Sequence, residues 1–402
     1  MSATGSAMEG VCVIDADTHL TEPYDLWTSR APDALRDRVP RVERVEGRPS
    51  WVVDGEDVWP ARGATAIRSD GSKARGTEFF NLEREEIHPG AYTLSERLAT
   101  MDEQGIWGQI VCPNAFGFGG QAFLRIADET LRVAIVRLYN DAMEDLQEES
   151  GGRLMPMAVM PWWDLDEMVA EASRAKEMGL HGVNTSTGPH NHGLPDLGAL
   201  HWDPFWACCA DLGLPVNFHI GAADSDFAWF GTVSWPSLKA DFKLGLGSAM
   251  LYLNNAAVVG NLVYAGVLER HPDLQIVSVE SGLGWIPFLM EALDYQLGEM
   301  SAKSLDALSI APSEYVRRQV HSCFWFEQRR AIEEAIDALG PHHIMFETDF
   351  PHPTCTYPDG LAKAVDAVAP FGRDVMADLL GGNAARLYHI ELPTSPGSSS
   401  GP

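Results

Sequence analysis

Residues 11–19 read Val-Cys-Val-Ile-Asp-Ala-Asp-Thr-His, a short apolar run that ends in acidic residues and a histidine. The apolar start indicates a β-strand, and continuous rather than alternating apolarity is typical of a strand covered on both faces. Asp17 and His19 are two residues apart, so their side chains point the same way in an extended chain. This arrangement suits two ligands on one metal ion.

Similar apolar runs recur along the chain and are predicted as buried strands. With a first strand at 11–16, they lie at 109–112, 154–160, 182–184, 216–219, 275–279, 321–326 and 343–347. Segments with helical spacing are predicted at 128–149, 164–178, 203–211, 285–296, 327–339, 361–369 and 373–380. Strands that alternate with helices in a chain of 402 residues favour a (β/α)8 TIM barrel. An open doubly wound sheet is the alternative, but no Gly-x-Gly-x-x-Gly follows the first strand.

The charge balance restricts the partners of this chain. It carries 29 basic and 57 acidic side chains, a formal net charge of −28. Such a chain repels phosphates, which excludes nucleic acid and disfavours an anionic membrane surface. The six cysteines show no Cys-x-x-Cys spacing, and neither a secretory signal nor a membrane-spanning run is visible. We therefore expect a cytoplasmic protein.

Two stretches exceed a minimal barrel and are predicted as insertions after strands one and five. The first covers about residues 30–100, and its part 30–75 carries ten basic and eight acidic residues. The second, 221–255, contains Phe227, Trp229, Phe230, Trp235 and Tyr252. Each is either surface elaboration or a cover that forms an apolar pocket over the barrel mouth. The predicted domain is a single metal-dependent barrel over 1–392, followed by a disordered tail at 393–402.

The predicted strands end in charged residues, at the end of a barrel where catalytic groups lie. His219 ends strand five, Glu280 follows strand six, and Asp349 and His352 follow strand eight. Together with the acid and the histidine of strand one, they would converge on one point. Carboxylates cannot crowd there without cations, because like charges at close range raise one another's pKa. Imidazole and carboxylate ligands without cysteine suit zinc, manganese or non-haem iron.

Taken singly, these residues have plainer interpretations. A histidine at a strand end is more often a hydrogen-bonded structural residue, and Asp349 alone could cap a helix. Glu327 at the end of strand seven is not assigned as a ligand. His190 and His192 lie in a loop flanked by Gly and Pro and are interpreted as polar loop residues. The combination of strand ends is what indicates a metal site.

Together these motifs resemble the amidohydrolase superfamily, and most closely its amidohydrolase-2 branch, which also holds aminocarboxymuconate-semialdehyde decarboxylase-like enzymes. The resemblance rests on Asp-Ala-Asp-Thr-His-Leu-Thr-Glu-Pro at 15–23, on His219, on Thr-Asp-Phe-Pro-His at 348–352 and on Gly-Asn-Ala-Ala-Arg-Leu-Tyr at 382–388. It implies a distorted (β/α)8 barrel that binds metal at the strand C-termini, from residue 11 to about residue 390. By motif position, it implies ligands at Asp17, His19 and His219, and it implies that Asp349 binds metal or handles a proton.

The sequence departs from the family pattern in ways that favour carboxylate ligands. Asp17 replaces the first His of the usual His-x-His, no Lys lies in 180–187, and Glu280 stands where relatives generally carry His. Adding Glu280 and His352 to the implied ligands gives three carboxylates and three imidazoles. That set exceeds the needs of one tetrahedral zinc ion and approaches what a di-iron oxygenase uses.

The favoured functional prediction is a non-haem di-iron monooxygenase with Glu280 and Asp349 as catalytic residues. It would use two iron ions and O2 to hydroxylate a bulky apolar carboxylic acid or its thioester, terpenoid- or polyketide-like, as in antibiotic or other secondary-metabolite biosynthesis. The alternative is a mononuclear zinc or manganese decarboxylase or hydrolase of a carboxylate substrate, in which Glu280 is a general base or a partner of His219. A non-catalytic binding protein would not explain the converging ligands. Relatives often form dimers, so a homodimer is a further expectation.

Overall fold

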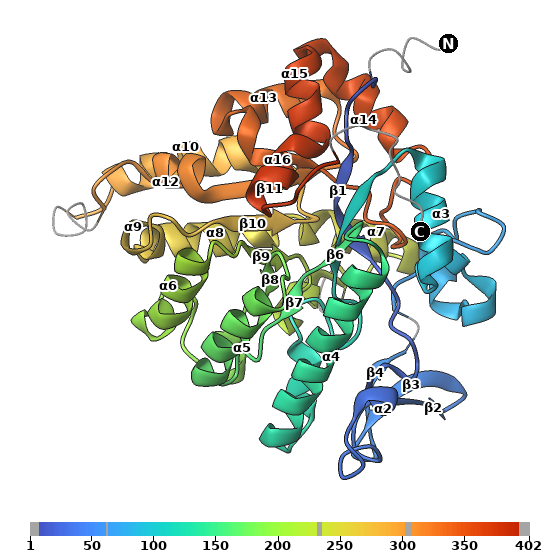
Figure 1. Cartoon of the computed structure of the whole chain (residues 1–402). Coiled ribbons are helices and arrows are strands. Elements are labelled where there is room, and N and C mark those ends of the chain that lie inside the picture. The colour runs from blue at the N-terminus through green and yellow to red at the C-terminus, as the bar shows by residue number, and fades with distance from the viewer. Residues whose placement is uncertain (1–7, 62, 231–234, 302–307, 394–402) are drawn as a thin grey trace.

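The computed structural model describes residues 8–61, 63–230, 235–301 and 308–393, and it confirms the distorted (β/α)8 barrel (Figure 1). The helices lie around the strands, as the alternation of strand and helix predicts. The barrel strands are β1 (Ile14–His19), β5 (Gly108–Cys112), β6 (Leu154–Pro156), β7 (Ala158–Val159), β8 (Val183–Asn184), β9 (Val216–His219), β10 (Ile276–Val279), β11 (Val320–Phe324) and β12 (Ile344–Phe346).

The barrel strands pair in parallel and in chain order. One sheet runs β1-β5-β6 and the other β7-β8-β9-β10-β11-β12, and the two are joined because β6 and β7 belong to the continuous segment 154–159. Two backbone hydrogen bonds close the circle. The N–H of Asp349 donates to the carbonyl of Asp17 (2.9 Å), and the N–H of His19 donates to the carbonyl of Phe350 (2.8 Å). The chain after β12 therefore lies beside the first strand.

The first strand lies further along the chain than predicted. The sequence indicated 11–16, but β1 covers Ile14–His19, so Asp17 and His19 belong to the strand itself. All six residues of β1 are buried, including these two and Asp15. The predicted strand ended too early because the apolar run stops before these polar residues. They are nevertheless buried, since distant parts of the chain pack around them.

Helix starts follow the capping signals of the sequence. The side chain of Asp128 accepts a backbone N–H at the start of α4 (Glu129–Glu149), and Asp164 accepts two at the start of α5 (Leu165–Glu177). Further predicted helices are found as α6 (Asp203–Leu212), α10 (Trp285–Gly298), α13 (Arg329–Leu339), α14 (Gly360–Val368) and α15 (Arg373–Ala377). The last is shorter than predicted, since a π-helical turn at Asp378–Gly382 replaces its end. Helices that the sequence analysis did not single out are α2 (Leu26–Arg30), α3 (Leu94–Gln104), α8 (Asn254–Tyr264), α9 (Val267–Arg270), α12 (Pro312–Gln319) and α16 (Asn383–Leu387).

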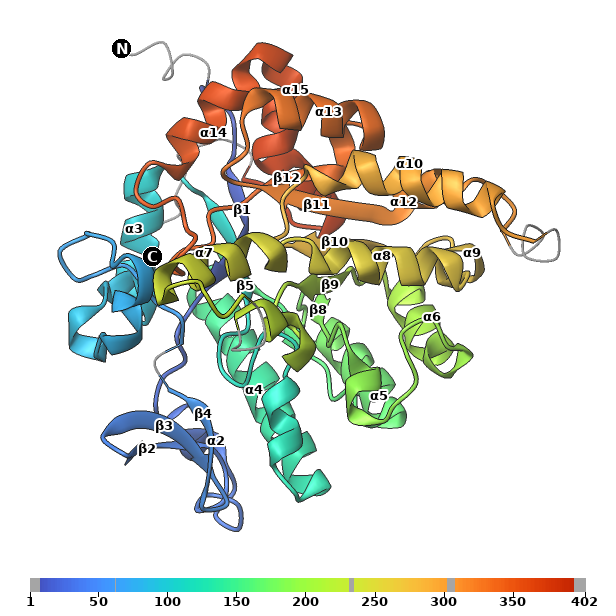
Figure 2. The same cartoon turned by 180° about the vertical axis from the view of Figure 1, so that it is seen from behind.

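The insertion after β1 forms a small sheet of its own. In it β2 (Arg41–Val45), β3 (Arg48–Val53) and β4 (Glu56–Pro60) pair in antiparallel fashion. Both cartoon views place this sheet, together with α2, to one side of the barrel (Figures 1 and 2). The chain then returns toward the barrel through residues 63–91.

The insertion after β9 is helical. It contains a short 3-10 helix, Asp224–Phe230, and α7 (Ala240–Leu251), which faces the viewer in Figure 2. Residues 231–234 of the predicted lid and 394–402 of the predicted tail lie outside the described residues. The disordered tail and the domain boundary at 392 therefore stay predictions.

One apolar stretch, Ala240–Tyr264, covers α7 and α8 and is long and apolar enough to cross a membrane by length and composition. A core helix of a soluble protein passes the same test. In the structure the stretch is divided into two helices, and α8 packs against α10 and α12.

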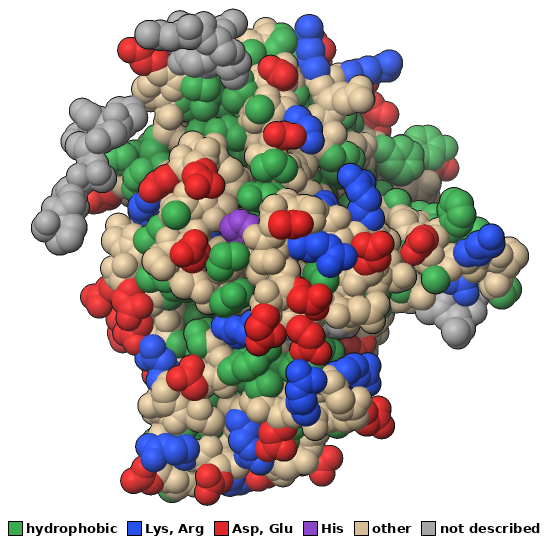
Figure 3. Space-filling model, turned by 90° about the vertical axis from the view of Figure 1, so that its right-hand side faces the viewer, with side chains coloured by type: hydrophobic (Ala, Val, Ile, Leu, Met, Phe, Trp, Pro, Cys, Tyr) green, Lys and Arg blue, Asp and Glu red, His purple; other side chains and the backbone are tan. Residues whose placement is uncertain are grey.

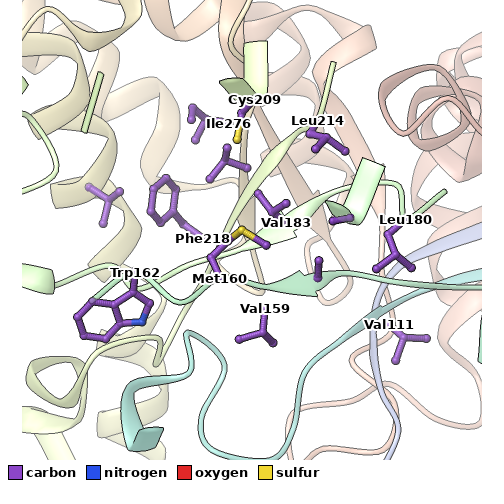
Figure 4. Packing of buried hydrophobic residues seen from close by; sticks show 14 of the residues in the cluster. Val111, Val159, Met160, Trp162, Leu180, Val183, Cys209, Leu214, Phe218 and Ile276 are labelled. Atoms are coloured by element: carbon purple, nitrogen blue, oxygen red, sulfur yellow. The ribbon is translucent and has the colours of Figure 1, made fainter. Parts of the chain in front are cut away.

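Apolar side chains fill the layer between the strands and the surrounding helices. Figure 4 shows Val183, Phe218 and Ile276 from three neighbouring strands, with Cys209 of α6 close to them. None of these side chains is more than 1% exposed. Burial of a side chain of this kind contributes about 1.5–3 kcal/mol, so this layer fixes the positions of the strand ends.

A buried arginine links α3 to two strands. The guanidinium of Arg97 donates to the carbonyl of His19 and to Oε1 of Gln109 (3.1 Å). Gln109 in turn donates to Asp15 (3.1 Å). Asp15 also accepts the N–H and the hydroxyl of Thr348, at 2.7 and 2.6 Å. This network connects β1 and β5 with the chain that follows β12.

Replacing Arg97 with Met is expected to lower the free energy of unfolding by about 3 kcal/mol, because buried acceptors lose charge-assisted hydrogen bonds. Chemical denaturation measures the change. Arg36→Met, at an exposed position in the same half of the chain, is the control and should alter stability by less than about 0.5 kcal/mol. Equal denaturation midpoints for R97M and the unmodified protein would contradict this account.

Candidate metal centre

Six side chains predicted as ligands come together at the C-terminal ends of β1, β9, β10 and β12. They form two groups of four, and within each group the ligand atoms all lie within 4.8 Å of one another. One group consists of Asp17, His19, His219 and Glu280, and the other of His19, Glu280, Asp349 and His352. The sequence therefore identified residues that meet in space, while their action as metal ligands stays a proposal.

In the first group, imidazole nitrogens and carboxylate oxygens face one another. Nε2 of His19 lies 3.1 Å from Nε2 of His219. The two oxygens of Asp17 lie 3.6 Å from His19 Nε2 and 3.5 Å from His219 Nε2. Oε2 of Glu280 is also 3.5 Å from His219 Nε2. The carboxylate distances exceed those of ordinary hydrogen bonds, so these atoms converge without pairing.

The second group adds the residues that follow β12. Oδ1 of Asp349 lies 3.6 Å from His19 Nε2 and 3.1 Å from His352 Nδ1. The rings of His352 and His19 stack with their centroids 3.7 Å apart. The Thr354 hydroxyl lies 2.9 Å from Oε1 of Glu280 and also contacts the Asp349 carboxylate. One hydroxyl thus connects two of the carboxylates.

The orientation of His219 is fixed from behind. Its Nδ1 lies 2.6 Å from the carbonyl of Ile220, to which an Nδ1–H donates. In the neutral ring this leaves the lone pair on Nε2, which faces the cluster. The ring of Phe118 covers His219 at a centroid distance of 4.2 Å. His219 is therefore held in the orientation that a metal ligand requires.

Burial opposes the charged forms of these residues. Burial, and next the Asp17 carboxylate, raise the pKa of Asp349 well above its ordinary value. Burial, and next Asp349, raise the pKa of Glu280. Burial lowers the pKa of His19 well below its usual range. For His219, burial would lower the pKa, but the adjacent Asp17 and Glu280 carboxylates raise it to about 9.

The unpaired atoms of the cluster fit a metal ion. Both oxygens of Asp17 and Oδ1 of Asp349 are buried and have no hydrogen-bond partner in the part of the chain that the structure describes. A buried polar atom without a partner costs about 1–3 kcal/mol, and more when it is charged. A divalent cation would remove that cost, and the mixed imidazole and carboxylate donors suit zinc, manganese or iron.

Two of the carboxylates belong to residues with unusual backbone conformations. Glu280 and Asp349 have φ values of 53° and 55°, in the left-handed region that non-glycine residues rarely adopt. Each such residue costs about 1–3 kcal/mol, and such strain clusters at functional sites. The sequence did not predict these left-handed conformations.

Glu347, directly after β12, is a buried carboxylate that the sequence analysis did not select. Its Oε2 lies 3.4 Å from the N–H of Glu280, and its Oε1 has no hydrogen-bond partner among the described residues. Burial, and next Asp17, raise its pKa well above the ordinary value. Glu347 precedes Asp349 by two residues, and the same spacing that pointed to Asp17 and His19 could have identified it.

The residues not assigned as ligands lie outside both groups. Glu327 accepts the backbone N–H of Leu283 (2.7 Å) and so holds a loop. His190 is exposed, and His192 lies 3.9 Å from Asp224. These positions fit the sequence analysis, which did not assign Glu327 as a ligand and interpreted His190 and His192 as polar loop residues.

A cavity of about 880 Å³ adjoins the cluster, and Glu280 and His352 form part of its lining. Both insertions supply its apolar walls, which include Trp59, Phe79, Phe80, Phe227, Phe230, Leu244, Leu251 and Tyr252. Of the aromatic residues predicted for the lid, Trp235 is 55% exposed and is not part of this lining. The insertions thus form the apolar pocket that was one of the two sequence-based alternatives.

Solved structures with the same fold cover nearly the whole chain. An amidohydrolase from Mycobacterium avium subsp. paratuberculosis is 24% identical, with 94% of this chain and 99% of that chain covered and a TM-score of 0.70. The 5-carboxyvanillate decarboxylase LigW from Sphingomonas paucimobilis is 21% identical, with 95% and 100% covered and a TM-score of 0.62. A dihydroxybenzoic acid decarboxylase from Polaromonas sp., solved with manganese and 2-nitroresorcinol, is 17% identical, with 96% and 98% covered and a TM-score of 0.61.

At these identities, the likeness to solved structures shows the fold. Family membership comes from the sequence match itself. The amidohydrolase-2 family model, described as amidohydrolase, matches residues 14–390, which include every strand of the barrel and both ligand groups. The chain therefore belongs to the amidohydrolase-2 family, as the motifs at its strand ends indicated.

Proposed function

We propose that this chain is a divalent-metal-dependent decarboxylase of a bulky apolar carboxylic acid. The observation that carries the proposal is the position of the ligand cluster beside a large cavity with apolar walls. Structures similar to this chain include decarboxylases, and two of them contain manganese. This was the alternative in the sequence analysis, and the comparisons give no support to the favoured di-iron monooxygenase.

Asp17, His19, His219 and Asp349 would hold the ion. Manganese or zinc would suit their nitrogen and oxygen donors. Such an ion, when bound, polarises a carboxylate oxygen of the substrate. His219 needs no reorientation for this task, since the carbonyl behind it already fixes the ring.

Glu280 is the carboxylate best placed to supply a proton. Of the three acids in the two ligand groups, it alone forms part of the cavity lining. Burial and the neighbouring Asp349 raise its pKa, which favours the protonated form near neutral pH. As the bond to the carboxyl carbon breaks, its electron pair stays on the substrate carbon and CO2 leaves. The proton of Glu280 then passes to that carbon, and solvent returns a proton to Glu280.

The number of ligands favours a second candidate, the di-iron monooxygenase. The two ligand groups share His19 and Glu280, and together they offer more donors than one tetrahedral ion uses. Carboxylate-rich sets of this kind hold two irons in other folds. Hydroxylation of the same apolar acid, or of its thioester, would consume O2 and two electrons from an external reductant.

Metal binding should depend on the buried ligands. Asp17→Asn and His219→Ala are each expected to reduce bound manganese by at least about 10-fold, because each removes a donor from the first group. Elemental analysis after dialysis against manganese measures this. His190→Ala removes an exposed histidine outside both groups and should leave the metal content unchanged. Full metal content in D17N and H219A would contradict the ligand assignment.

Glu280→Gln separates the two candidate functions. A decarboxylase should release CO2 from bulky aromatic acids without O2, and E280Q should retain its metal while the rate falls by about 10²–10⁴-fold, the contribution of a general acid. Metal analysis and CO2 release under anaerobic conditions give both values. O2 uptake on addition of substrate, with loss of one of two irons in E280Q, would support the monooxygenase and overturn the decarboxylase.

A further inference from the structure

Three cationic side chains line the cavity without carboxylate partners. They are Lys73, Arg75 and Arg125. Within the described residues, none of them has a carboxylate oxygen within 4 Å. Elsewhere in the first insertion arginines are paired, as Arg38 is with Asp54 at 2.8 Å. In a chain with a net charge of −28, unpaired cations around a cavity indicate an anionic ligand.

Lys73 stands at the metal side of the cavity. It is half-buried, and its Nζ donates to the carbonyl of Cys355 (2.5 Å), in the loop that also carries His352 and Thr354. A substrate carboxylate that approaches the cluster meets the carboxylates of the ligand groups. Lys73 supplies a positive charge on that approach, in addition to the charge of a bound metal ion.

Arg125 marks the other side of the cavity, next to the small sheet. Its guanidinium lies over the ring of Trp59 at 5.7 Å, and Nη1 donates to the carbonyl of Val58 (2.9 Å). These contacts fix the side chain and leave further N–H donors for a ligand. Trp59 and Arg125 also line a second hollow of about 380 Å³, so Arg125 stands where the two spaces meet.

Two acids, Asp224 and Asp241, also line the cavity but form no ion pair with these cations in the part of the chain that the structure describes. Asp241 accepts the backbone N–H of Thr77 (3.3 Å), and Oδ2 of Asp224 lies 3.9 Å from Nε2 of His192. Both belong to the second insertion, whereas Lys73 belongs to the first. Lys73 therefore stands on the side of the ligand cluster and Arg125 on the side of the small sheet, and apolar side chains form much of the lining of the same cavity.

We propose that the substrate carries two anionic groups at opposite ends of an apolar body, the inner one held near Lys73 and the outer one by Arg125. The inner contact rests on the proposed function, since it places the reacting carboxylate beside the ligand cluster. The outer contact does not depend on the reaction. Lys73 of the first insertion and Arg125, which follows β5, would then select the substrate by its two charges.

Binding of simple acids to the manganese-loaded protein tests this. The probes are straight-chain α,ω-dicarboxylic acids of about eight to sixteen carbons and the matching monocarboxylic acids, which cover a range of spacings in a cavity of this size. By titration calorimetry, the best diacid should bind at least about 10-fold more tightly than its monoacid, the effect of one charge-assisted contact. Arg125→Gln should abolish this preference and leave monoacid binding unchanged, while the control Arg36→Gln should preserve both.

Equal affinity for diacids and monoacids, or a preference that survives in R125Q, would overturn the inference. Should R125Q fail to fold, the unmodified protein still tests it, because the preference for diacids must fall as salt is added. The assay requires no turnover. A diacid preference, with no CO2 release from the bulky aromatic acids, would refute only the decarboxylase. CO2 release from those aromatic acids, with no preference for diacids, would refute only the second charge.

Discussion

Two backbone hydrogen bonds between β1 and the chain after β12 close the barrel, and they also bring the two ends of the ligand set together. Asp17 and His19 come from the start of the chain, and Asp349 comes more than three hundred residues later. Arg97 and Asp15 hold the same junction through hydrogen bonds to His19 and Thr348. Barrel closure and assembly of the candidate metal centre are therefore one structural event.

This junction gathers charges that are unfavourable together. Burial and the neighbouring carboxylates oppose the charged forms of Glu280 and Asp349, and the left-handed conformations of these two residues add strain. The remaining fold tolerates these costs because the apolar layer around the strands is large. Many other acids are of a different kind, since acidic and basic side chains are interspersed over the face that Figure 3 shows. The net charge of −28 says little about the centre, whose acids are buried.

The sequence predicted the barrel and the six residues that come together at the cluster. Both predictions follow from local patterns, namely the apolar runs that form the strands and the charged residues at the ends of those runs. It placed the first strand too early and missed Glu347 and Arg97, whose burial depends on partners far away in the chain. The small antiparallel sheet was also missed, because charged residues interrupt the apolar residues within its strands. The insertion therefore shows no clear apolar pattern. Local patterns identify the elements, whereas the pairing of distant polar groups comes from the folded chain.

Glu280 connects the question of metal number to the question of reaction. It belongs to both ligand groups and also lines the cavity. A carboxyl group that holds a proton for the substrate is neutral, whereas a metal ligand must be ionised, so Glu280 cannot serve both purposes at once. With one ion held by the other residues, Glu280 would not be needed as a ligand and could serve as an acid. A second ion beside Glu280 would remove that proton, and the cavity would lose its proton donor. The number of ions bound therefore determines which chemistry this arrangement of residues can perform.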